Sequence, residues 1–241
     1  MSNSIHKFFK RENHSTFTRR ECESALRDFE QLMKLPLEKF SVKGIAVGLN
    51  IRVNDSPENY LPVPISYRGK KFREYPPQQG NRIIERICNG GEMSLKFYDK
   101  SAQFYQTEKV RLYSPLIFRF ETVVTRMRYL HRKLNRARLT AKELFSEPFI
   151  SAMAKNQLQL FETIDKKIEM DLSKLTPEEI KIISIMESED LKKGLKEFHP
   201  HTFKKDRVKY LKLKNKLQFS DSKVKELREK FRDEAEKILS N

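Results

Sequence analysis

The stretches KFYDKSA at residues 96–102 and FRFETVVTR at residues 118–126 decide the fold. In both, apolar and ionic residues alternate, which is the pattern of strands whose successive side chains point to opposite faces. In the first strand Leu95, Phe97 and Asp99 share one face, and Lys96, Tyr98 and Lys100 share the other. In the second strand Arg119, Glu121 and Val123 share one face, and Phe118, Phe120 and Thr122 share the other.

The character of the chain changes near residue 126, since only Gly194 lies beyond Gly91. Short alternating segments with Gly, Pro and Asn breaks come before that point, and helical patterns come after it. The sequence predicts an α+β fold with an antiparallel sheet and packed helices in the N-terminal half, followed by a helical C-terminal region. We expect an α+β domain over 1–130 and a basic helical region over 131–241.

Several elements follow from local patterns. Residues 4–9 and 40–53 are expected to be strands, and Gly48 in the second of these indicates a bulge or a close backbone approach. A capping box of Thr18 and Glu21 predicts the start of a helix. The expected buried face of that helix comprises Cys22, Ala25, Leu26, Phe29, Leu32 and Met33. Further helices are expected over 148–172, from Thr176, and over 201–217 and 221–239.

The chain of 241 residues has 49 Lys and Arg against 33 Asp and Glu, a formal net charge of +16. Such a surplus attracts polyanions, so nucleic acid is the favoured partner. The alternative is a basic protein from an AT-rich genome. There is no secretory signal and no run of 18 apolar residues, so a cytoplasmic protein without a membrane span is expected. Two cysteines make no disulfide framework.

Tyr98 lies between Lys96 and Lys100 in the predicted strand. A tyrosine hydroxyl is a weak nucleophile unless its anion is stabilised, and neighbouring ammonium groups favour the phenolate and neutralise phosphate. This arrangement is typical of a nucleophile that attacks phosphate. The alternative is an ordinary tyrosine lying across a sheet beside two solvated lysines.

Arg119 and Glu121 share a sheet face two residues apart. Arg119 could hold a phosphate in a fork, and Glu121 could hold Mg²⁺ or Mn²⁺ through oxygen. The alternative is a cross-strand salt bridge. The pair His199 and His201 flanks Pro200, which favours a surface linker over a metal site.

Basic clusters elsewhere indicate phosphate-contacting surfaces, which position a nucleic acid without specifying its sequence. The alternative is a set of solvated helix faces. The candidate nucleic-acid-binding residues are Lys96, Arg126, Arg128, Arg132, Lys204, Lys205, Arg207 and Lys209.

The segments LKFYDKSAQ and LIFRFETVVTR resemble the paired signatures of rolling-circle replication initiators of the phage and plasmid type, the replication initiation factors and filamentous-phage replication endonucleases. Tyr98, Asp99 and Lys100 match the first signature, and Arg119 and Glu121 match the second. The resemblance covers roughly residues 4–130. Members of this family carry further strands before such a segment, so the resemblance implies a shortened N-terminus.

The resemblance implies a site-specific DNA nickase that initiates replication and then rejoins the strand. Tyr98 would attack single-stranded origin DNA and form a 5′-phosphotyrosine link, with Lys100 and Arg119 as further catalytic residues. Glu121 would hold a divalent metal, Mg²⁺ or Mn²⁺, and a host helicase would be a further partner. The first alternative is a non-catalytic basic DNA-binding protein with the same fold. The second is an RNA-binding protein in which Phe97, Tyr98 and Tyr105 stack on bases.

Overall fold

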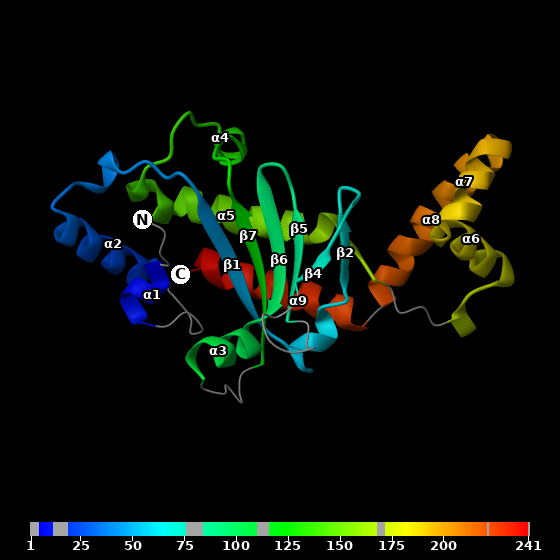
Figure 1. Ribbon diagram of the computed structural model, residues 1–241, viewed down its shortest axis with the longest axis horizontal. Helices are drawn as coiled ribbons and strands as arrows, with labels where there is room; N and C mark the ends of the chain where they lie inside the picture. Colours follow the sequence, from blue (N-terminus) through cyan, green and yellow to red (C-terminus); the bar gives the residue numbers. More distant parts are fainter. Residues whose placement is uncertain are drawn as a thin grey trace. The chain divides into compact units, whose positions relative to one another are not determined.

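The computed structural model describes residues 5–11, 19–75, 84–109, 116–167, 172–220 and 222–240 (Figure 1). The chain divides into two compact units: Met1–Asp165 with Leu227–Asn241, and Lys166–Glu226. The expected boundary near residue 130 is therefore wrong, because helices from the second half pack on the sheet of the first. The expected α+β class, with an antiparallel sheet in the N-terminal half and helices in the C-terminal region, is confirmed.

The first unit is built on an antiparallel sheet of five strands in the order β1-β7-β6-β5-β4. Its strands are β1 (Ile45–Arg52), β4 (Arg73–Tyr75), β5 (Glu85–Asn89), β6 (Met93–Asp99) and β7 (Ile117–Val124). A smaller sheet has the order β3-β2-β8, with β2 (Pro64–Tyr67), β3 (Lys70–Lys71) and β8 (Ile164–Lys166). The helices are α1 (Ile5–Lys10), α2 (Arg19–Met33), α3 (Lys100–Glu108), α4 (Arg128–Leu134), α5 (Glu147–Thr163) and α9 (Ser222–Ser240).

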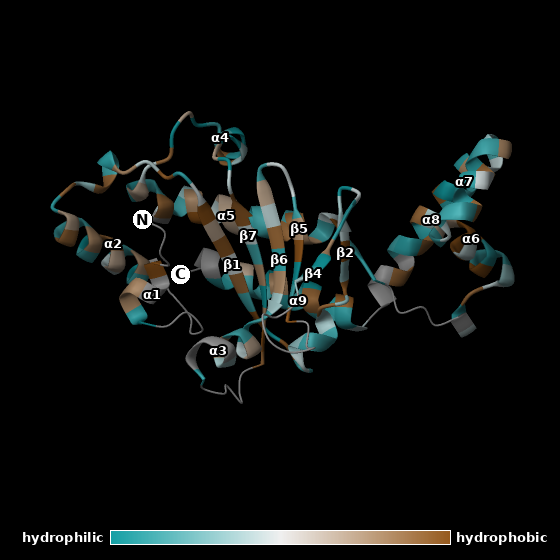
Figure 2. Cartoon of the chain, viewed as in Figure 1, coloured by the Kyte–Doolittle hydropathy of each residue, from teal (hydrophilic) through white to brown (hydrophobic). Residues whose placement is uncertain are grey.

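One face of the large sheet forms the core of the first unit. Phe97 and Phe120 stack across β6 and β7 with ring centroids 4.6 Å apart. Phe231 of α9 meets Phe120 edge-on at 5.5 Å and stacks on Phe161 of α5 at 4.2 Å. These rings place α5 and α9 on the same face, behind the strands in Figure 1. Figure 2 shows hydrophobic residues gathered along α5 and the strands in front of it.

A buried amide ties α5 to the strands at this core face. Gln157 accepts a hydrogen bond from the Thr122 hydroxyl at 2.9 Å and donates one to the Val47 carbonyl at 2.7 Å. Thr122 lies on the same face as Phe118 and Phe120, as the alternation predicts. The polar groups left inside the core are thereby satisfied, as burial requires.

The second unit contains α6 (Pro177–Glu187), α7 (Glu189–Phe198) and α8 (Pro200–Ser220). Thr176 begins α6 with the predicted capping box, since its hydroxyl accepts from the Glu179 amide and the Glu179 carboxylate accepts from the Thr176 amide. The core of this unit comprises Ile182, Ile183, Met186, Leu213 and Leu217. His199 ends α7 and Pro200 begins α8, so the expected linker at these residues is a single helix-to-helix junction.

Other expectations need correction. Residues 5–10 form α1 rather than a strand, because Phe8 packs edge-on against Phe29 of α2 and Lys10 pairs with Glu21 at 2.7 Å. The strand expected over 40–53 begins only at Ile45. Leu32 was expected on the buried face of α2 and is exposed. Thr18 lies outside the described residues. None of the described helices is both long and apolar enough to cross a membrane.

Candidate functional site

The face of the large sheet opposite α5 and α9 carries the polar residues of β6 and β7. Antiparallel pairing sets Tyr98 opposite Arg119 and Lys96 opposite Glu121. On the other side of β7, Arg119 lies opposite Asn50 of β1. Neighbouring side chains on one sheet face approach closely enough to bond across strands. The structure therefore brings together Tyr98, Arg119 and Glu121, which the sequence had predicted to form one site.

The Glu121 carboxylate is the centre of this group. Its Oε2 atom accepts a hydrogen bond from the Tyr98 hydroxyl at 3.2 Å and one from Arg119 Nε, also at 3.2 Å. Arg119 Nη1 donates to Asn50 Oδ1 at 2.9 Å, which fixes the other end of the guanidinium. The expected salt bridge alternative is thus present, and the tyrosine shares its acceptor. This cluster is called the Tyr98 cluster below: Asn50, Tyr98, Arg119 and Glu121.

Gly48 makes room for the guanidinium of Arg119. A Cβ atom at this position would lie only 2.5 Å from Arg119 Cζ. The side chain therefore lies flat over the backbone of β1, where no other residue type leaves space. The close backbone approach predicted from the glycine is correct, and its cause is a side chain from the neighbouring strand.

Tyr98 is a neutral phenol in this setting. The side chain is only 5% exposed. Burial raises the pKa of Tyr98 well above its usual value, and the carboxylates of Glu121 and Glu85 raise it further, while Arg119 opposes them. The expectation that lysines favour the phenolate is therefore wrong for the resting site. Glu121 is the group placed to remove the proton.

The two lysines beside Tyr98 are engaged elsewhere. Lys96 lies 3.5 Å from the carboxylate of Glu85. Lys100 is buried and donates to Gln103 at 2.9 Å, with its ammonium 5.8 Å from the centre of the Tyr98 ring. Lys100 does not continue the strand, because β6 ends at Asp99, whose side chain caps α3. It contacts the Tyr98 ring from α3 rather than from the shared sheet face.

A divalent metal fits poorly at Glu121. Within the described residues, no group of three or more His, Cys, Asp or Glu side chains could hold a metal ion. The Glu121 oxygen already faces the cation of Arg119, which repels a second positive charge. Metal use stays a prediction, and no chemical step below depends on it.

The predicted basic clusters differ in how much of their charge is available. Arg128 and Arg132 both pair with Glu92, so much of their charge is neutralised. In the second unit Lys209 pairs with Glu178 at 2.8 Å. The residues left exposed without an ion pair to another described residue are Arg126, Lys204, Lys205 and Arg207.

Helix α8 differs from its expected apolar stripe. Leu213 and Leu217 are buried against α6, while Val208 and Leu211 are exposed between lysines. The stacking surface expected for RNA is also not formed as predicted. Phe97 is 1% exposed and stacks on Phe118 and Phe120, so its ring is closed to bases.

Sequence reasoning missed Asn50 and Glu85, which complete the surroundings of Tyr98. Both could have been found from alternation, since each lies on the same face as its cross-strand partner. Comparison with known proteins adds no relative: the chain matches no protein-family model, no curated protein and no solved structure.

Proposed function

We propose that this chain binds single-stranded DNA on the polar sheet face and cuts and rejoins it through Tyr98, as a replication initiator would. The observation that supports this most is the Tyr98 hydroxyl donating to Glu121, which also accepts from Arg119. A nucleophile hydrogen-bonded to a base that a third group orients is the arrangement required for covalent catalysis. The net charge of +16 supports an anionic substrate.

The reaction balances with residues of this chain alone. Glu121 takes the phenolic proton as the Tyr98 oxygen attacks phosphorus, and the bond from phosphorus to the 3′-oxygen breaks. The proton then passes from Glu121 to the 3′-oxygen, which leaves as a hydroxyl. Arg119 stabilises the charge that builds on the phosphoryl oxygens. The reverse sequence rejoins the strand, so no oxidant, reductant or nucleotide is consumed.

Covalent capture tests the proposal. The full chain is incubated with a single-stranded library of random sequence, in Mn²⁺, in Mg²⁺ and in EDTA, and adducts are resolved on denaturing gels. We expect an adduct from the wild-type chain and from Tyr75→Phe, which alters an exposed tyrosine of β4 in the same sheet. Tyr98→Phe should form none. An adduct that survives in Tyr98→Phe overturns the assignment, and the EDTA lane decides the metal prediction.

A non-catalytic DNA-binding protein is the second candidate, and the burial of Tyr98 favours it. A phenol that is 5% exposed must become accessible before it can attack a phosphate. Absence of an adduct under every metal condition, together with retained DNA binding, selects this function.

Binding by exposed basic residues has its own signature. Each phosphate contact that is lost reduces the slope of log affinity against log salt by about one for duplex DNA, and by ~0.7 for a single strand. Replacing Lys204, Lys205 and Arg207 with Ala should therefore reduce the slope by about two for a single strand. Unchanged slopes would exclude α8 as the binding surface.

A further inference from the structure

A hollow of about 410 Å³ lies in the first unit, where the chain before β1 meets α4 and the segment after it. Its lining residues are Ser41, Val42, Lys43, Met127, His131, Ala137, Arg138 and Leu139. Volumes of roughly 300–1,000 Å³ are typical of small-molecule sites. None of these residues belongs to the Tyr98 cluster.

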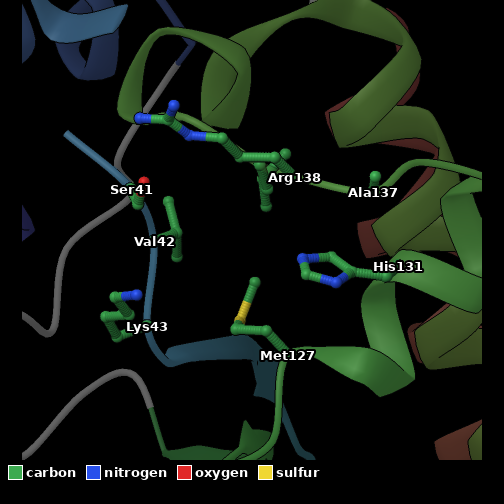
Figure 3. A pocket seen from close by; sticks show the side chains of 8 residues that line it. Ser41, Val42, Lys43, Met127, His131, Ala137 and Arg138 are labelled. Atoms are coloured by element: carbon green, nitrogen blue, oxygen red, sulfur yellow. The ribbon is translucent and has the colours of Figure 1, made fainter. Parts of the chain in front are cut away.

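One side of the hollow is apolar and aromatic. Figure 3 shows the imidazole ring of His131 pointing into the hollow from α4, with Val42 across from it and the thioether of Met127 below. A flat ring, a branched aliphatic side chain and a polarisable sulfur together suit a planar aromatic ligand.

The hollow is also positively charged. Lys43 and Arg138 line it, and within the described chain neither forms an ion pair with another residue. No carboxylate lines it. The neighbouring Arg132 and Arg136, by contrast, are paired with Glu92 and Glu143. The cations that remain available are therefore those facing the hollow, which suits an anion such as phosphate.

Backbone hydrogen bonds fix the two sides of the hollow. Val42 donates to the Leu139 carbonyl at 3.0 Å, and Ser41 forms an isolated bridge with Thr140. Arg136 donates to the His131 carbonyl at 2.9 Å, which ties the second segment back to α4. The site is thus formed before a ligand arrives, which lowers the cost of binding.

We propose that this hollow binds one nucleotide, with the base between Val42, Met127 and His131 and the phosphate at Lys43 and Arg138. The nucleotide is either free or part of a single strand, since both present the same base and phosphate. Its binding requires neither Tyr98 nor Glu121, so the proposal stands independently of strand cutting.

Calorimetry with the full chain tests the proposal. The probes are deoxyadenosine monophosphate, deoxyadenosine, inorganic phosphate and an eight-nucleotide deoxyadenosine strand. We expect the monophosphate to bind at least tenfold more tightly than phosphate or deoxyadenosine alone, because only it uses both sides of the hollow. Equal affinity for the monophosphate and inorganic phosphate overturns the proposal.

Variants locate the binding. The double variant Lys43→Ala/Arg138→Ala should weaken binding of the monophosphate about tenfold or more, and His131→Ala should weaken it severalfold. The matched control is Lys155→Ala/Arg232→Ala, which removes one lysine and one arginine from exposed positions on α5 and α9. If the control loses as much affinity as the double variant, general charge explains the binding and the hollow is not the site.

The source of the nucleotide is decided by competition. Displacement of the strand by the free monophosphate, at matching concentrations, assigns a free nucleotide. If the strand binds at least tenfold more tightly and the monophosphate displaces it only at excess, the hollow holds a base of the strand. Binding of the strand that Lys43→Ala/Arg138→Ala and His131→Ala leave intact overturns both.

Discussion

The two faces of the large sheet are made by the same strands and differ in every physical respect. On one face, Phe97 and Phe120 stack beneath α5 and α9 and are closed to solvent. On the other, Tyr98 and Arg119, the next residues along in β6 and the previous one in β7, share Glu121. The comparison teaches that a one-residue step separates packing from polar chemistry, because side chains alternate across a strand.

The largest effect is expected on the core face. Phe120→Ala removes a ring that contacts Phe97 and Phe231, and should lower the free energy of unfolding by ~3–5 kcal/mol because a cavity remains. Urea titration measures it. The control is Val123→Ala, three residues further along β7 on the polar face, for which a much smaller loss is expected. Equal losses would mean that the two faces contribute alike.

The next effect tests the polar face. Glu121→Gln removes the charge that faces Arg119 while keeping the shape, and should cost ~1.5–3 kcal/mol because a charged hydrogen bond in a half-buried site is lost. The control is Glu162→Gln at the more exposed pair with Arg228, where less than about 1 kcal/mol is expected. A smaller cost at Glu121 than at Glu162 contradicts the central role of this carboxylate.

Alternation predicted the two faces correctly, because a period of two is a local property of the chain. It placed Phe118 with Phe120, and Arg119 with Glu121, on opposite sides of β7. It failed at Lys100, because Asp99 ends the strand by capping α3. A helix cap competes with continued extension, and local spacing alone did not show which would win.

Long-range partners were beyond the reach of local pattern. The charge on Lys96 is directed to Glu85 by the register of β5 and β6, which no local pattern specifies. The boundary at residue 130 failed for the same reason, since Phe231 completes the core with Phe120 from more than a hundred residues away. The raised pKa of Tyr98 follows from burial, which only the folded chain determines.

A third prediction concerns Gly48, which links the polar face to the backbone of β1. Gly48→Ala should destabilise the fold by ~1–2 kcal/mol, because the added Cβ would displace the Arg119 guanidinium. Gly91→Ala is the control, since a Cβ there meets nothing. In the background of Arg119→Ala, the cost of Gly48→Ala should shrink towards that of the control, as a double-mutant cycle would show. A cost that persists would place its origin in the backbone.

The smallest effect separates Tyr98 from the other tyrosines by pH. An unfolded tyrosine loses its proton near ~10, while burial and neighbouring carboxylates raise the pKa of Tyr98 above that value in the folded chain. The stabilisation is complete below pH ~10 and is lost as the pH rises through the folded pKa, since the unfolded state releases its proton first.

Between pH 9 and 11 the free energy of unfolding should therefore fall, and Tyr98→Phe should make that fall smaller by about 1 kcal/mol. Burial also raises the pKa values of Tyr67 and Tyr129, so part of the fall remains in the variant. Urea titrations at the two pH values measure the difference. If Tyr98→Phe leaves the fall unchanged, the phenol is not held protonated by its surroundings. Glu121 would then not be required as its base, and the polar face would lose its claim to catalysis.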